Sequence, residues 1–90
     1  MRKIEQGMLN AISAGKTNWV SGNTRVHSIV GGVEIQLHGN IIATVDEYFT
    51  RPDLKTFRTW PTSTTVSRLR ALGINASIKN FQPCIDGKEI

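Results

Sequence analysis

The chain has 90 residues, of which 39% are hydrophobic and 20% are charged, and it carries a formal net charge of +4. This length leaves room for one hydrophobic core, and the composition is that of a folded globular domain and not of a disordered segment. No apolar run approaches the roughly 20 residues of a membrane-spanning helix, and Met1-Arg2-Lys3 leads into no signal-peptide core, so we expect a single soluble domain over residues 1–90.

The N-terminal part predicts one helix followed by a loop. Residues 3–14 carry apolar side chains at helical spacing, and Gly15 is available as a C-terminal stop. Residues 16–23 are rich in turn formers, so we expect a connection that Trp19 and Val20 anchor to the core. The apolar residues at helical spacing are Ile4, Met8, Leu9, Ala11 and Ile12.

Two alternating stretches predict a β-hairpin with strands at about 25–30 and 33–38, joined by Gly31-Gly32. After the turn signal Gly39-Asn40, residues 41–47 predict a third strand that is apolar on both faces and therefore central or covered. The hairpin pairs on its apolar face would be Val30 with Val33, Ser28 with Ile35 and Val26 with Leu37. Its other face would carry Arg25, His27, Ile29, Glu34, Gln36 and His38.

Residues 48–60 predict short extended pieces. Tyr48 and Phe49 can extend the sheet, because both are residues that favour strands. Arg51-Pro52-Asp53 interrupts the pattern, and residues 56–60 look like another extended piece that Pro61 ends.

The C-terminal part predicts a second helix and then a small strand or hairpin. Thr62 or Ser63 can cap a helix over residues 63–72, and Gly73 follows its end. Residues 74–90 alternate and contain an Asp86-Gly87 turn signal. The apolar side of the helix would be Val66, Leu69 and Leu72, which leaves Ser67, Arg68 and Arg70 exposed.

These elements predict an α+β fold with an αβββα core, in which two helices pack on an antiparallel sheet. The same order of elements occurs in double-stranded RNA-binding domains and in the related HicA-type toxins. This likeness concerns topology alone and does not fix the function.

The titratable residues predict no catalytic centre. HicA-type toxin ribonucleases use a histidine in a Gly-Ser-His-His stretch, whereas His27 and His38 stand in different surroundings, so a small ribonuclease is only an alternative. Cys84 is the only cysteine, which excludes an intrachain disulfide and fits a reducing cytoplasm. Paired metal ligands and nucleotide-binding glycine motifs are missing, so we expect neither a metal nor a cofactor.

Residues 58–70 allow two interpretations. Hydroxyl groups and backbone N–H groups at the helix start, with nearby arginines, could bind a phosphate. Alternatively, the hydroxyls cap the helix, Trp60 packs in the core and the arginines are solvated. The residues concerned are Arg58, Thr62, Ser63, Thr64, Thr65, Ser67, Arg68 and Arg70.

Two stretches resemble a family of small proteins of tailed bacteriophages. That family carries a Leu-His-Gly-Asn-x-Ile-Ala turn, present here at 37–43, and a Trp-Pro-Thr-x-Thr-Thr-x-Ser-Arg-Leu helix start, present here at 60–69. The resemblance also includes residues 1–6, weakens beyond Asn75, and implies an origin in the cytoplasm of phage-infected bacteria without implying an activity. The matching positions are His38, Asn40, Thr64, Thr65, Ser67 and Arg68.

We therefore expect an accessory protein that binds a host or phage protein and modulates it, with Tyr48, Phe49, Arg58 and Arg68 as candidate anchors. The alternative is nucleic-acid binding through the basic helix 63–72 region, because the net charge is positive. An exposed sheet edge would also allow a homodimer. The basic residues of the nucleic-acid alternative are Arg51, Lys55, Arg58, Arg68, Arg70 and Lys79.

Overall fold

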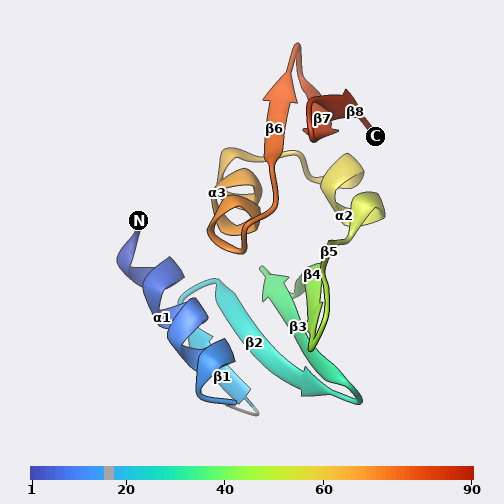
Figure 1. The fold of residues 1–90 in the computed structure, drawn as a ribbon. Helices are drawn as coiled ribbons and strands as arrows, with labels where there is room; N and C mark the ends of the chain where they lie inside the picture. The colour runs from blue at the N-terminus through green and yellow to red at the C-terminus, as the bar shows by residue number, and fades with distance from the viewer. Residues whose placement is uncertain (16–17) are drawn as a thin grey trace.

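The computed structural model of the chain describes residues 1–15 and 18–90 and has the expected α+β class (Figure 1). In this described part of the chain, eight strands form two antiparallel sheets, and three helices pack against them. The helices are α1 (Lys3–Ser13), α2 (Leu54–Thr59) and α3 (Ser63–Ala71). The strands are β1 (Asn18–Ser21), β2 (Thr24–Ile29), β3 (Gly32–Leu37), β4 (Asn40–Asp46), β5 (Thr50–Pro52), β6 (Ala76–Lys79), β7 (Gln82–Ile85) and β8 (Lys88–Glu89).

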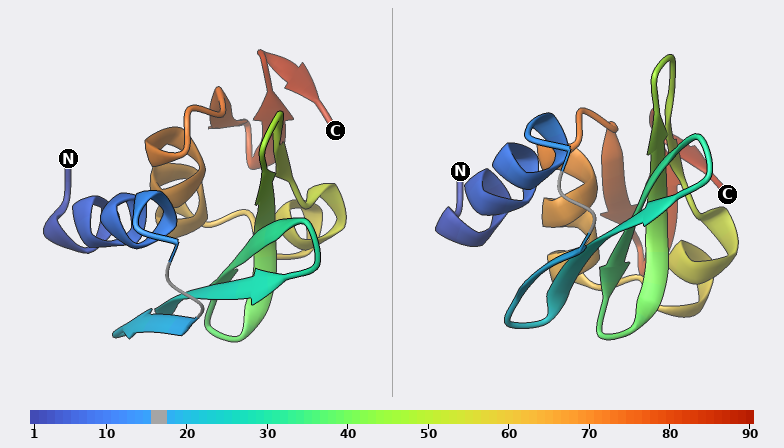
Figure 2. Two further views of the ribbon diagram at one scale, coloured as in Figure 1. Left: turned by 60° about the horizontal axis from the view of Figure 1, so that its bottom comes forward. Right: turned by 90° about the horizontal axis from the view of Figure 1, so that it is seen from below.

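The larger sheet has five strands in the order β1-β2-β3-β4-β5, so each strand pairs with its neighbour in sequence. Helix α1 packs on β2, α3 packs on β4, and the two helices contact each other (Figure 2). Fully buried side chains from the sheet and from the helices fill the core between the two layers. They are Val26, Ile35 and Ala43 from the sheet and Met8, Phe57 and Leu69 from the helices.

The smaller sheet, β6-β7-β8, packs against α2 and α3 through β7 and β6. Its two connections are tight turns in which both central residues have positive φ, which is the geometry of type I′ hairpins. Asp86-Gly87 forms one of them, as predicted, and Asn80-Phe81 forms the other. The C-terminal segment is therefore a three-stranded sheet and larger than the expected strand or hairpin.

The register of the first hairpin differs from the predicted one by two residues. Ile29 pairs with Gly32, so Val30-Gly31 forms the turn and Val30 is fully exposed. A shift of two residues keeps every side chain on its face, and the predicted apolar face of Val26, Ile35 and Leu37 is indeed buried. Only glycine fits at this position in the strand, because a Cβ on residue 32 would clash with the carbonyl oxygen of Val45.

The loop predicted for residues 16–23 is wrong at residues 18–21, which form β1 and pair with β2. Gly22 and Asn23 form a turn, and Lys16 and Thr17 lie outside the described residues. Trp19 packs against the core as predicted, but Val20 is exposed. A Cβ on Gly7 would lie 2.9 Å from Cζ2 of Trp19, so the helix has a glycine where the indole ring packs on it. This contact outweighs the low helix propensity of glycine.

The segment between β4 and α3 also differs from the prediction. Residues 54–59 form α2 and not an extended piece, because Oδ1 of Asp53 accepts a hydrogen bond from the backbone N of Thr56 at 2.9 Å and caps the helix. Phe57, 1% exposed, then fills the core from this helix. Tyr48 and Phe49 do not extend the sheet but form the turn between β4 and β5.

The other predicted elements are confirmed within a few residues of their expected ends. The first helix ends at Ser13, and α3 begins at Ser63 with Thr62 as its N-cap. Gly73 follows α3 with a φ of 89°, as its place after the helix predicts. The third predicted strand is β4, which lies between β3 and β5 inside the sheet.

Replacing Gly32 with alanine tests the close approach of β3 to β4. We expect Gly32→Ala to lower the free energy of unfolding by about 2 kcal/mol or more, because the added Cβ meets rigid backbone. Urea denaturation measures this change, and Ser28→Ala on the neighbouring strand is the control, with an expected effect within about 0.5 kcal/mol. Equal stability of the two variants would contradict the packing described here.

Candidate functional site

Helix α3 is fixed to α1 by a buried ion pair. Nη1 of Arg68 lies 2.7 Å from Oε2 of Glu5, and both side chains are almost fully buried. The hydroxyl of Ser67 donates a second hydrogen bond, of 2.5 Å, to the same carboxylate oxygen. The prediction that Arg68 is exposed is therefore wrong: the whole residue is only 3% exposed.

The same guanidinium also binds the start of β2. Nε of Arg68 donates to Oγ1 of Thr24 at 3.0 Å, and Nη2 donates to Oδ1 of Asn23 at 3.4 Å. Thr24 is fully buried, so its hydroxyl has little access to water. Arg68 thus connects α1, α3 and the larger sheet, which is the kind of complete pairing that a buried charge requires.

The environment of Glu5 acts on its pKa in two directions. Burial alone raises the pKa of the Glu5 carboxyl, whereas the hydrogen bonds from Ser67 and Arg68 and the charge of Arg68 lower it. The net result is a pKa below the ordinary value of 4.5. The carboxylate is therefore charged at neutral pH and available to Arg68.

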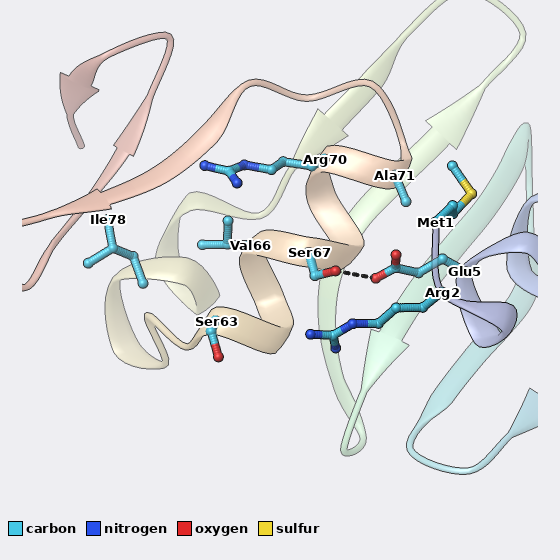
Figure 3. Close-up of a pocket in the computed structure, with 9 residues that line it drawn as sticks. All are labelled: Met1, Arg2, Glu5, Ser63, Val66, Ser67, Arg70, Ala71 and Ile78. Carbon is cyan, nitrogen blue, oxygen red and sulfur yellow. Dashed lines mark hydrogen bonds between the residues drawn. The ribbon is translucent and has the colours of Figure 1, made fainter.

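An open groove of about 560 Å³ lies between α1, α3 and β6 (Figure 3). Ser63, Ser67 and Arg70, three residues of the predicted phosphate site, line it, and Arg2 from the N-terminal segment reaches toward α3 on the opposite side. Arg70 is exposed as predicted, but its Nε donates a hydrogen bond of 2.7 Å to the carbonyl oxygen of Ala76. Ser67 and Arg70 thus have structural partners within the fold.

A smaller pocket of about 300 Å³ lies on the other side of the α3 start. It is lined by two stretches that are far apart in the sequence, namely the turn between β3 and β4 and the segment from α2 to α3. These are the two stretches that carry the phage-protein resemblance. The lining residues are Leu37, His38, Asn40, Ile42, Thr56, Trp60, Thr62 and Thr65.

The threonines of this pocket cap α3. Oγ1 of Thr62 accepts a hydrogen bond of 3.1 Å from the backbone N of Thr65, and the two hydroxyls lie 2.9 Å apart. Thr65 also donates to the carbonyl oxygen of Trp60 at 3.4 Å. The capping interpretation is therefore confirmed for these residues, whereas Trp60 is 55% exposed and not in the core. Thr64 lines neither hollow.

Two predicted anchor residues project from the turn between β4 and β5. Tyr48 is 79% exposed and Phe49 is 58% exposed. Oδ1 of Asp46 accepts hydrogen bonds from the backbone N of Tyr48, at 2.8 Å, and from that of Phe49, at 2.7 Å. These bonds lower the pKa of the Asp46 carboxyl, so the group is charged at neutral pH and accepts both hydrogen bonds of the turn. We call Tyr48 and Phe49 the aromatic tip.

Arginine contributes to the aromatic tip. The guanidinium carbon of Arg51 lies 5.1 Å from the centre of the Phe49 ring, within the range of a cation–π interaction. The other exposed basic residues of the nucleic-acid alternative lie apart from this turn on three elements, with Lys55 and Arg58 on α2, Arg70 on α3 and Lys79 on β6. The structure therefore does not gather these charges on α3.

The histidines lie in separate places. His27 stands opposite Glu34 in the β2–β3 pair, and its Nδ1 is buried without a hydrogen-bond partner, whereas His38 lies in the β3–β4 turn at the small pocket. Within residues 1–15 and 18–90, no three His, Cys, Asp or Glu side chains are grouped to hold a metal ion. Nor is any helix in this described part long and apolar enough to cross a membrane.

Glu5, Thr24 and Arg2 are neighbours of α3 that the sequence prediction missed. A signal existed for Arg68, because positions 65, 68, 69 and 72 lie on one side of a helix and include the apolar Leu69 and Leu72. The partner carboxylate stands 63 residues away, and no sequence pattern connects the two.

Comparison with protein families gives a match over the whole chain. The family model described as Kyanoviridae Gp96 protein matches residues 1–90. Comparison with curated proteins and with solved structures found no match.

The lowered pKa of Glu5 predicts an acid-sensitive connection between α1 and α3. Because the folded-state pKa lies below the unfolded value, the resulting stability is present above pH 4.5 and is lost as the pH falls through the folded-state pKa. Urea unfolding from about pH 7 to about pH 3 measures this loss. Glu5→Gln is the control that removes the titrating group, so its stability should depend less steeply on pH over the acid part of that range. An identical pH dependence of the two proteins would contradict the assignment.

Proposed function

Because this chain belongs to the Kyanoviridae Gp96 protein family, a family of bacteriophage proteins, we propose that it is an accessory protein that binds and modulates a protein of the phage or its host. In this proposal it acts in the cytoplasm of the infected bacterium and by binding, not by catalysis. Cys84, its only cysteine, is buried and free, which is compatible with a reducing compartment.

The observation that carries this proposal is the aromatic tip. Tyrosine and other large aromatic side chains dominate the energy of protein interfaces, because they bury a large area with few rotatable bonds. Neither Tyr48 nor Phe49 contributes to the core, so their exposed rings do not stabilise the fold by burial of apolar surface.

The conformation of the turn supports the same function. The Asp46 carboxylate fixes the backbone of both aromatic residues before any partner arrives. A turn that is already ordered loses less conformational entropy on binding than a mobile one. The aromatic tip is therefore suited to insert into an apolar cleft of another protein. Arg51, beside Phe49, could then pair with a carboxylate of that protein at the rim of the cleft.

The nucleic-acid alternative through α3 receives less support from the geometry. Arg68 is enclosed by Glu5, Ser67 and Thr24, so its charge is neutralised inside the fold. Of the basic residues predicted on this helix, Arg70 alone is exposed. A single exposed arginine on α3 is a weak attraction for a phosphate backbone.

Replacing the aromatic tip tests the proposed function. We expect the tagged Tyr48→Ala/Phe49→Ala double variant to recover its partner from infected-cell lysate at least about tenfold less than the parent chain, because each ring is an interface anchor. Quantitative cross-linking and mass spectrometry measure the recovery. The variant should remain folded, since both side chains are largely exposed.

Phe81→Ala is the matched control for this experiment. Phe81 is 93% exposed at the tip of the β6–β7 hairpin, so its removal deletes an exposed aromatic ring from a different sheet. Partner recovery with this control should equal that of the parent chain. Unchanged recovery with the double variant, or equal losses with both, would rule out the aromatic tip as the specific anchor.

A further inference from the structure

We propose that the small pocket between the β3–β4 turn, α2 and the start of α3 binds a nucleobase, either of a free nucleotide or of an unpaired nucleotide in a single strand. This pocket is formed by residues 37–42 and 56–65 and contains no residue of the aromatic tip. The inference is therefore independent of the proposed protein-binding function.

The size and walls of the pocket fit one flat ring. Its volume of about 300 Å³ is at the lower end of the range for ligand pockets, which suits a single base better than a large ligand. Leu37 and Ile42 supply apolar surface, and Trp60 adds an indole that is more than half exposed. Exposed aromatic rings of this kind are the usual stacking partners of unpaired bases.

The polar groups of the pocket fit the edge of a base. The hydroxyls of Thr62 and Thr65 are engaged in the α3 cap, so His38 and Asn40 are the remaining polar side chains at the β3–β4 turn. In the part of the chain that the structure describes, neither side chain has a hydrogen-bond partner. The Asn40 amide offers both donors and an acceptor, the combination that the hydrogen-bonding edges of bases require.

The conformation of the β3–β4 turn places these two residues at the pocket. His38 adopts a φ of 52° and Gly39 one of 80°, and the backbone N of His38 donates a hydrogen bond of 2.8 Å to the carbonyl oxygen of Asn23. These values are those of a type I′ turn, whose twist matches that of the two strands it joins. The hairpin and the hydrogen bond to Asn23 thus hold the turn, with His38 and Asn40 on the pocket side.

Charge distinguishes a nucleotide from an aromatic side chain of a protein. Lys55 and Arg58 are exposed on α2, the helix that supplies the pocket residue Thr56, but they do not line the pocket itself, and the chain as a whole carries +4. The phosphate of a nucleotide extends beyond its base, so cations outside the pocket can attract it, whereas an apolar protein side chain gains nothing from them. The combination of one ring, one amide and two cations therefore favours a nucleotide.

Nuclear magnetic resonance of the full chain tests the inference directly. The two indole N–H signals, from Trp19 and Trp60, separate the core from the pocket, and Trp60→Phe assigns them. The probes are adenosine and cytidine monophosphates, short single-stranded DNA and RNA, and N-acetyltryptophanamide as a substitute for a protein side chain. We expect saturable shifts at Trp60, Asn40 and His38 with nucleotides, and none at Trp19.

Salt distinguishes the two possible ligands, a single strand and a free nucleotide, because the binding of a strand depends more on its phosphate charges. If the natural ligand is a single strand, oligonucleotides should bind more tightly than monophosphates, and added salt should weaken their binding, less so in the Lys55→Ala/Arg58→Ala variant. If it is a free nucleotide, the monophosphates should bind at least as tightly as the oligonucleotides. Either result supports a nucleobase site.

Variants confirm where the ligand binds. Trp60→Ala and Asn40→Ala should each weaken binding about tenfold or more, whereas Trp60→Phe should retain part of it and Lys79→Ala, outside the pocket, should change it little. Circular dichroism verifies that each variant is folded. The inference is overturned by three results: no nucleotide shifts, shifts that persist in Trp60→Ala, or binding of N-acetyltryptophanamide alone, which would assign the pocket to a protein side chain.

Discussion

The contact between Arg68 and Glu5 is the interaction on which the arrangement of the helices depends. Both charges are removed from water, so each is tolerable only while the other is present. The geometry meets this requirement with Ser67 as a further donor to the carboxylate and Thr24 as a further acceptor for the guanidinium. A slide of α1 along α3 would separate these groups, which makes the position of the two helices specific as well as stable.

The groove toward α1 and the small pocket beside Trp60 both follow from the position of α3. The buried side of this helix holds Arg68 and Leu69. One of its flanks, with Ser63, Ser67 and Arg70, lines the groove toward α1, and the capping threonines at its start line the pocket beside Trp60. The aromatic tip depends on a different device, the Asp46 carboxylate at the end of β4. The fold thus offers two independent candidate binding features, one set by helix packing and one by a turn.

Local sequence patterns predicted the elements whose apolar residues recur at helical or strand spacing. The spacing of Ile4, Met8 and Ala11 predicted α1, and alternation from Val26 to Leu37 predicted the first hairpin and its buried face. Helix α2 was missed because residues 56–60 resemble a strand in composition, while the helix depends on the Asp53 cap and the burial of Phe57.

The site itself was predicted only in part, because its contacts are long-range. The hydroxyl cap of α3 and the exposure of Arg70 follow from short motifs and residue types. The Glu5–Arg68 pair joins residues 63 apart, and the pocket joins the turn at His38 to the segment at Trp60. No periodicity connects such positions, so the sequence could name these residues without showing what each one contacts.

The most direct measurement of the central claim is a double-mutant cycle of Glu5→Leu and Arg68→Met, followed by urea denaturation at neutral pH. We expect each single variant to be strongly destabilised and the double variant to be at least about 2 kcal/mol more stable than the sum of the two single effects, because no buried charge is then left unpaired. Arg70→Met on the exposed side of α3 should add to Glu5→Leu without coupling. Additivity of Glu5→Leu and Arg68→Met within about 0.5 kcal/mol would contradict the claim that this pair fixes the helices.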